Sequence, residues 1–249
     1  MTAGRVRLMI TIGVVGVLEA MCRLGTIDRF AMPPPSEIKW NLGRILVTGQ
    51  MWPAIAKTFA NVAAAGAAAI VAGVALGTLI HRWVALRETL DPAFAAYYAI
   101  PIYAFYPLFI VVFGLGDLPQ VLIGFMLALV AVIVNTLNGL DRVPRVLLKT
   151  ARIQRLGRVS TALKVSLPFA APYVFTGIKL AVAYSFIGVI GSEFILSSGG
   201  LGYRISFSYN NFQSDVMYGL ILFVLLVVIC INMGLYAWER SLMERRGGR

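Results

Sequence analysis

The chain has 249 residues, of which 59% are hydrophobic and only 13% are charged, and its formal net charge is +11. Soluble domains carry charge on about a quarter of their residues, so this composition excludes an ordinary soluble protein. Several stretches of about twenty residues are almost free of charge, which is the length of helix that crosses a hydrocarbon core about 30 Å thick. The sequence therefore predicts an all-α membrane protein. Its positive charge is explained by membrane topology rather than by nucleic-acid binding.

The hydropathy pattern predicts six membrane spans. In chain order they cover residues 8–27, 54–80, 94–115, 119–138, 170–195 and 216–238. The predicted organisation is an N-terminal transmembrane helix over 1–30, an outer interfacial segment over 31–53, a core of five spans over 54–239 and a basic tail over 240–249. The first span is predicted to be retained, because no small-residue cleavage site follows its apolar stretch.

The interfacial segment is predicted to contain a short helix. Pro33-Pro34-Pro35 must be non-helical, and Ser36 with Glu37 then opens an amphipathic helix. Trp40 and Trp52 are expected at the depth of the lipid headgroups, because tryptophan prefers that interface.

The distribution of lysine and arginine predicts the orientation. With the N-terminus inside, the cytoplasmic segments hold fifteen basic residues and the outer segments hold four. Seven of the fifteen lie in the loop 140–168. Basic loops stay in the cytoplasm, so both termini and this central loop are predicted to be cytoplasmic in a multi-pass membrane protein.

Small residues and prolines distinguish two of the spans. Gly66, Gly73 and Gly77 allow close helix approach in span 54–80, which we expect to be central in a helix bundle and to pack against a second subunit. Pro101 and Pro107 interrupt the tyrosine-rich span 94–115. Its aromatic side chains would line a translocation pathway or, alternatively, serve helix packing and an interfacial belt.

Ionisable groups within the spans are few. Glu19 and Arg23 are four residues apart and are expected to pair. Lys179 is expected to snorkel, and it and Arg23 are the cations available to hold an anion. Glu193 has no basic residue at helical spacing, so it is a candidate for substrate contact, although a structural role capping backbone groups is favoured.

No enzyme motif occurs in the sequence. Cys22, Cys230 and His81 form no metal-binding spacing, and there is no catalytic triad or phosphate-binding glycine loop. The chain is therefore predicted not to be an enzyme and to bind no cofactor of its own.

Five stretches, in order, resemble permease subunits of bacterial ATP-binding-cassette importers in the nitrate/sulfonate/taurine branch. They are PPPSEI, LDPAFAAYYAIPIYAFYPLFIVVFGLG, VNTLNGL, SLPFAAPYVFTGIKLA and FIGVIGSEFILSSGGLGYRI. The most specific is the last, with Gly188, Glu193, Phe194, Gly200, Leu201, Gly202 and Tyr203 in the order such permeases use. The resemblance implies a type I importer permease of the bacterial inner membrane, with about six spans and a cytoplasmic coupling-helix loop.

In this family the central loop inserts into a groove on the ATPase subunit. Its pattern is Glu-Ala-Ala, a glycine four residues after the second alanine, and a closing Leu-Pro. Here Lys149 replaces the glutamate, Arg155 replaces the glycine, and a glycine follows two residues late. The implied coupling residues are Lys149, Ala151, Arg152, Arg155, Gly157, Leu167 and Pro168. The altered chemistry is compatible with an acidic ATPase surface, a second permease that carries the standard loop, or neutral drift.

The resemblance also implies a pathway, partners and a substrate class. The pathway candidates are Tyr98, Tyr103, Tyr106, Asn135, Tyr184 and Glu193, and the candidate contacts for a binding protein are Gly200, Gly202 and Tyr203. The partners are two ATPase copies holding ATP and Mg, a second permease subunit (identical or different), a periplasmic or lipid-anchored binding protein, and membrane lipids. The expected substrate is a small anion such as a sulfonate, taurine or nitrate. The alternatives are a neutral aromatic or heterocyclic nutrient, an ion-coupled carrier that uses Glu193, and a membrane scaffold or sensor without flux.

Overall fold

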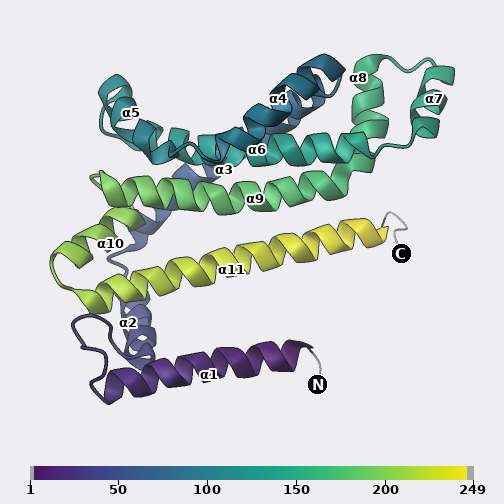
Figure 1. Cartoon of the computed structure of the whole chain (residues 1–249). Coiled ribbons are helices and arrows are strands. Elements are labelled where there is room, and N and C mark those ends of the chain that lie inside the picture. Colours follow the sequence, from purple (N-terminus) through teal and green to yellow (C-terminus); the bar gives the residue numbers. More distant parts are fainter. Residues whose placement is uncertain (1–2, 246–249) are drawn as a thin grey trace. The chain divides into compact units, whose positions relative to one another are not determined.

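The computed structural model describes residues 3–245, which form helices joined by turns, with no strand among them (Figure 1). The all-α fold class is confirmed. The ends of the predicted N-terminal helix and basic tail, residues 1–2 and 246–249, lie outside the described residues. The helices are α1 (Ala3–Arg23), α2 (Pro35–Thr48), α3 (Trp52–Ile80), α4 (Val84–Tyr97), η1 (Ile102–Phe105), α5 (Tyr106–Phe113), α6 (Asp117–Asp141), α7 (Arg145–Ile153), α8 (Arg158–Thr161), the π-helical η2 (Ala162–Ser166), α9 (Leu167–Ile195), α10 (Leu201–Asn210) and α11 (Ser214–Arg245).

Four helices of the described chain are long and apolar enough to cross a membrane, and a bent pair makes a possible fifth. The four are α3, α6, the continuous helix Arg158–Ile195 and Ser214–Ser241 of α11. Helix α1 has 21 residues but is not among them. Each 18-residue window of α1 contains three charged residues, so the crossing expected for residues 8–27 stays a prediction.

The prediction that residues 94–115 form one continuous helix is wrong. Helix α4 ends at Tyr97, a new helical segment starts at Ile102, and the two are bent by 87°. Pro101 lies in the gap and supplies no N–H, so the hydrogen-bond ladder cannot continue through it. The sequence located the kink but not the complete break.

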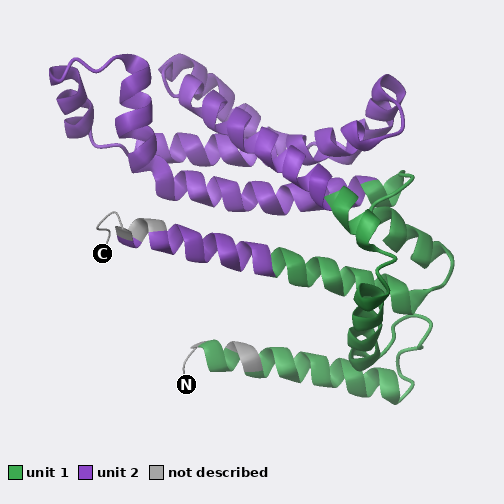
Figure 2. Cartoon of the chain, turned by 180° about the vertical axis from the view of Figure 1, so that it is seen from behind, with its two compact units in different colours: residues 1–58, 193–229 green, residues 59–192, 230–249 purple. Residues whose placement is uncertain are grey.

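The structure divides into two compact units (Figure 2). Unit 1 consists of residues 1–58 and 193–229. In it, Glu19 accepts hydrogen bonds from Arg23 Nε (2.7 Å) and from the N–H and hydroxyl of Ser36 (3.0 and 2.7 Å). The predicted Glu19–Arg23 pair is therefore confirmed, and it also holds α1 against α2. Helix α2 begins at Pro35, one residue earlier than expected, because proline is tolerated in the first helical turn.

Unit 2 consists of residues 59–192 and 230–249, and its core is built by glycines. A Cβ on Gly73 would lie 2.6 Å from Val132 of α6, and one on Gly77 would lie 2.9 Å from Thr136. A Cβ on Gly188 of α9 would lie 2.5 Å from the Cα of Gly124 in α6. These glycines let α3 and α9 pack against α6 of the same chain. We expected these small residues to pack against a second subunit. Gly73 and Gly77 instead pack against α6 of the same chain.

The coupling loop, the membrane residues and the family

The first helix of the central loop, α7, ends in a Schellman motif at Arg155. The N–H of Leu156 donates to the carbonyl of Ala151 (3.0 Å), and the N–H of Arg155 donates to the carbonyl of Arg152 (2.9 Å). Arg155 has a φ of +53°, the left-handed conformation that this motif needs and that glycine adopts most readily. The position counted against the glycine of the coupling pattern thus keeps a glycine's backbone conformation with an arginine side chain.

The later glycine does not take over this role. Gly157 has φ −65° and ψ 163°, an extended conformation open to any residue. It precedes α8, and the chain then continues as one helix from Arg158 to Ile195. The predicted start of the fifth span at residue 170 is therefore too late, because the span helix already begins inside the loop.

The closing Leu167-Pro168 pair lies within this continuous helix. Proline lacks an N–H, and its ring crowds the carbonyl four residues earlier, which here belongs to Lys164. The π-helical turn Ala162–Ser166 surrounds that carbonyl, and such turns relieve this kind of conflict by widening the backbone. The central loop and α9 are therefore joined by continuous helix.

Helix α7 exposes a mixed basic and apolar surface. Ala151 is buried at 2% exposure, whereas Val146 and Ile153 are 70% and 81% exposed. Lys149 and Arg152 are also exposed. Apolar side chains exposed next to charged ones mark a candidate interaction surface.

The tyrosines proposed for the pathway have separate environments in unit 2. The hydroxyl of Tyr103 donates to the carbonyl of Ile187 on α9 (2.5 Å), and its ring occupies the space beside Gly191. Tyr106 is 1% exposed and packs with Ile102 and Ile123 in a core cluster. Tyr98, at the end of α4, is 55% exposed. Tyr103 and Tyr106 therefore act in helix packing.

The other two candidates in unit 2 lie on α6 and α9. Asn135 donates to the carbonyl of Ala131 in its own helix (2.8 Å) and is half-buried. Tyr184 packs against the cluster formed by Ala69, Ala128, Val132 and Ala181. Asn135 thus bonds within its own helix and Tyr184 packs in the core of unit 2, so their role in a pathway stays a prediction.

Glu193 is fully buried in unit 1 and caps α10. The hydroxyl of Thr58 donates to its carboxylate (2.8 and 2.9 Å), and so does the N–H of Gly202 (2.9 Å). The Thr58 hydroxyl in turn accepts the N–H of Leu201 (2.7 Å). The first N–H groups of a helix have no partner within it, and a carboxylate is favourable there. Glu193 thus joins three segments of unit 1 through the start of α10.

The turn before α10 leaves little surface for a binding protein at its glycines. Gly200 has a φ of +98°, and a Cβ on it would collide with the Glu193 carboxylate. Gly202 is buried as well, whereas Tyr203 is half-buried and Arg204 is exposed. The contact expected through Gly200 and Gly202 stays a prediction, and in this structure both glycines are buried and shape the turn.

The cations that the sequence offered for holding an anion are paired. In unit 2, Lys179 Nζ lies 2.6 Å from the carboxylate of Glu239, and both side chains are largely buried. The Lys179 ammonium also lies 5.8 Å from the centre of the Tyr236 ring. In unit 1, Arg23 is paired with Glu19. Each of the two cations therefore has a carboxylate that neutralises it.

Sequence reasoning missed two polar contacts between helices. Thr58 was not singled out, although it holds both Glu193 and Leu201. In unit 2, the amide of Asn61 on α3 donates to Gln120 (3.0 Å) and Asp117 (3.3 Å) of α6. The available signal was a polar residue inside a small-residue span, which in a membrane needs a polar partner.

Comparison with known proteins identifies the family. The model of the binding-protein-dependent transport system inner membrane component matches residues 42–246. The chain belongs to this family. This permease is 32% identical over 184 residues to the nitrate import permease protein NrtB of Leptolyngbya laminosa, covering 74% of this chain and 66% of that protein. It is 24% identical over 247 residues to the taurine transport system permease protein TauC of Escherichia coli, covering 96% and 90%.

Other matches extend the set of relatives. The bicarbonate transport system permease protein CmpB of Synechococcus elongatus is 30% identical over 175 residues, covering 70% of this permease and 63% of CmpB. The permease thus spans about two thirds of the length of NrtB and slightly less of CmpB. An inward-facing structure of the MetNI methionine ABC transporter matches with a TM-score of 0.66 at 18% identity, over 78% of this chain and 97% of that one. This structural match shows a shared fold.

The family membership confirms the predicted resemblance and a multi-pass inner-membrane permease of the importer class. The relatives are transport permeases, in agreement with the prediction that the chain is not an enzyme. Neither the neutral-nutrient importer nor the ion-coupled carrier is favoured by these matches.

Proposed function

We propose that this permease moves a small anion into the cell, using ATP hydrolysed by a separate ATPase subunit. The observation that carries the proposal is the family match over 42–246, which includes the whole central loop and the helices on both sides of it. The relatives are named for nitrate, taurine and bicarbonate, and each of these solutes carries an anionic group. Two ATPase copies holding ATP and Mg, a second permease and a binding protein complete the proposed complex.

The central loop is proposed to carry the coupling. Helix α7 offers an exposed basic and apolar surface. The turn that follows α7 is fixed by the left-handed backbone conformation of Arg155. The helix that begins at Arg158 continues into the membrane as α9. Closure of the ATPases on ATP would therefore displace α7 and rotate α9. The translocation pathway would then open outward, because the outward-facing state makes better contacts with the closed ATPases.

The loop is proposed to lie in the cytoplasm together with the C-terminus. In unit 2 the Phe175 ring lies 5.2 Å from the Trp238 ring. Phe175 is about 12 Å along α9 from its first residue, and Trp238 is about 10 Å along α11 from its last. The two helix ends therefore reach the same side, and the excess of basic residues there favours the cytoplasm.

Specificity for the anion is proposed to reside mainly in the binding protein. Lys179 and Arg23 are already neutralised by Glu239 and Glu19, so neither offers a strong fixed charge to the substrate. The exposed Arg204 beside Tyr203 is a candidate contact for the binding protein.

The test is replacement of residues 152–157 by a Gly/Ser linker of equal length. We expect the permease to insert normally but to lose co-purification of the ATPase, along with transport in proteoliposomes that contain the binding protein. The matched control is Leu115→Ser, an exposed position in the turn at the opposite end of α6, which should leave both intact. Stoichiometric ATPase and undiminished transport in the linker variant would refute the coupling assignment.

A further inference from the structure

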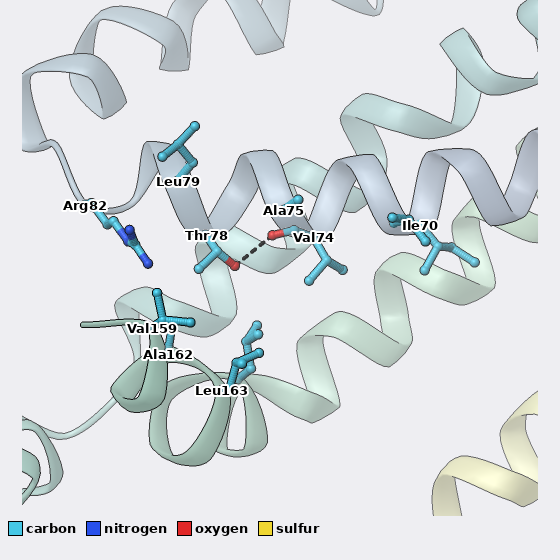
Figure 3. Close-up of a pocket in the computed structure, with 11 residues that line it drawn as sticks. Ile70, Val74, Ala75, Thr78, Leu79, Arg82, Val159, Ala162 and Leu163 are labelled. Carbon is cyan, nitrogen blue, oxygen red and sulfur yellow. Dashed lines mark hydrogen bonds between the residues drawn. The ribbon is translucent and has the colours of Figure 1, made fainter. Parts of the chain in front are cut away.

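Unit 2 contains an apolar groove between α3 and the start of the long helix that leads into α9. Its volume is about 610 Å³, and Figure 3 shows the residues that line it. Ile70, Val74 and Leu79 of α3 line one side, and Val159 and Leu163 line the other. None of the residues proposed for the translocation pathway contributes to it. The walls are aliphatic over most of their length, so the groove suits a hydrocarbon chain.

One end of the groove is basic. Arg82 lies there and points toward Val159 (Figure 3). A second hollow of about 800 Å³ shares Thr78, Arg82 and Ala162 with the groove. Its wall adds Arg152 and Arg158 from the coupling loop. The groove therefore opens into a space lined by three arginines.

This basic end carries a net positive charge. Among the described residues, no carboxylate lies within 4 Å of the charged group of Arg82, Arg152 or Arg158, although nearby His81 pairs with Asp141 (3.1 Å). Three guanidinium groups around one hollow present a forked set of donors that suits a phosphate group. Thr78, Thr161 and Ser166 also line this hollow, and the hydroxyls of Thr78 and Thr161 donate to backbone carbonyls four residues earlier in the chain.

We propose that the groove and the basic hollow together bind one anionic glycerophospholipid. The acyl chain would lie along α3 and the phosphate among Arg82, Arg152 and Arg158. From Ile70 to Arg82 the chain advances about 18 Å, close to the 15 Å thickness of one leaflet's hydrocarbon. The arginine end follows directly after the span and next to Trp83, at the depth where headgroups lie. Basic pockets at this membrane face are typical sites for acidic headgroups.

Two features favour a lipid over other occupants. The ligand must be apolar over a full leaflet and anionic at one end, which is the chemistry of a phospholipid and not of a helix from a second subunit. A soluble anion would use only the basic end and leave the groove empty. The lipid would bridge the end of α3 to the coupling loop, so its binding would stiffen the loop that the ATPase contacts.

The test measures retained lipid by native mass spectrometry of the full-length permease, extracted from vesicles of equal phosphatidylglycerol and phosphatidylcholine content. The wild type should retain phosphatidylglycerol preferentially. Each arginine near an anionic group contributes about fivefold to affinity, so Arg82→Gln with Arg158→Gln should weaken retention about 25-fold. The charge-matched control, Lys149→Gln with Lys164→Gln, lies outside both hollows and should change it less than fivefold.

A second variant tests the groove independently. Ala75 is an exposed position on its wall, so Ala75→Trp should fill the groove and lower phosphatidylglycerol retention without removing a charge. Arg82→Lys with Arg158→Lys should keep most of the binding and show that the double variant folds. Equal losses in the glutamine variants and their control would reduce the effect to general surface charge and overturn the proposal. It would also be overturned if Ala75→Trp had no effect, if inorganic phosphate displaced the lipid, or if cross-linking placed a second subunit in the groove.

Discussion

The role of Glu193 can be tested by comparing two substitutions. Glu193→Ala removes the acceptor for the Thr58 hydroxyl and for the N–H of Gly202, both of which are buried. Leaving a buried donor unsatisfied costs about 1–3 kcal/mol, so the expected loss of stability is about 2–6 kcal/mol. For a chain of this length about 2–4 °C of Tm corresponds to each kcal/mol, so Tm should fall by at least about 4 °C.

Glu193→Gln separates this structural role from a role of the charge in transport. The amide oxygen can accept both hydrogen bonds, so we expect a Tm loss smaller than about 4 °C and transport above half of the wild-type rate. The assay is thermal unfolding in detergent together with uptake by proteoliposomes. Glu37→Ala is the matched control, since its carboxylate is half-exposed and pairs only at the surface with Arg29, an interaction worth at most about 1 kcal/mol. The reasoning fails if Glu193→Gln unfolds like the wild type but abolishes transport.

Two further pairs of substitutions test the backbone geometry. Arg155→Gly should make the loop more resistant to proteolysis, because the left-handed conformation costs a non-glycine residue about 1–2 kcal/mol. Arg155→Val should make the loop less resistant. Equal cleavage rates of the two variants would contradict the Schellman motif. Gly188→Ala should destabilise the permease by about 1–3 kcal/mol or more, because the new Cβ clashes with the backbone of α6. The control Gly157→Ala should leave Tm unchanged, because Gly157 has open space around it and ordinary dihedral angles. A smaller Tm loss for Gly188→Ala than for Gly157→Ala would refute this packing.

The sequence was informative where one residue decides the local backbone. Counting back from Leu167-Pro168 placed Arg155 at the glycine of the coupling pattern, and Arg155 has the positive φ of such a glycine. The structural role favoured for Glu193 agrees with its hydrogen bonds to Thr58 and Gly202. In both cases the relevant physics is local or follows from placing a charge in an apolar span.

The sequence was less informative where the outcome depends on tertiary partners. The small residues of α3 predicted close packing, but a pattern of glycines cannot say whether Val132 of the same chain or another subunit fills the space beside Gly73. The pairing of Lys179 with Glu239 joins residues sixty positions apart, so no spacing rule finds it. The groove beside Arg82 likewise arises only when α3 and α8 are placed next to each other.

The break between α4 and η1 has a mechanical consequence. In a continuous span such as α6, any sharp bend must break backbone hydrogen bonds of the helix. At residues 98–101 that ladder is already interrupted, and the local bonds are short turns such as the one from the N–H of Ile100 to the carbonyl of Tyr97 (3.1 Å). No helix backbone therefore resists a change of the 87° angle there, and the angle is held by side-chain packing such as the burial of Ile102 and Tyr106 against α6. The orientation of η1 and α5 relative to α4 thus depends on tertiary contacts rather than on the stiffness of a helix.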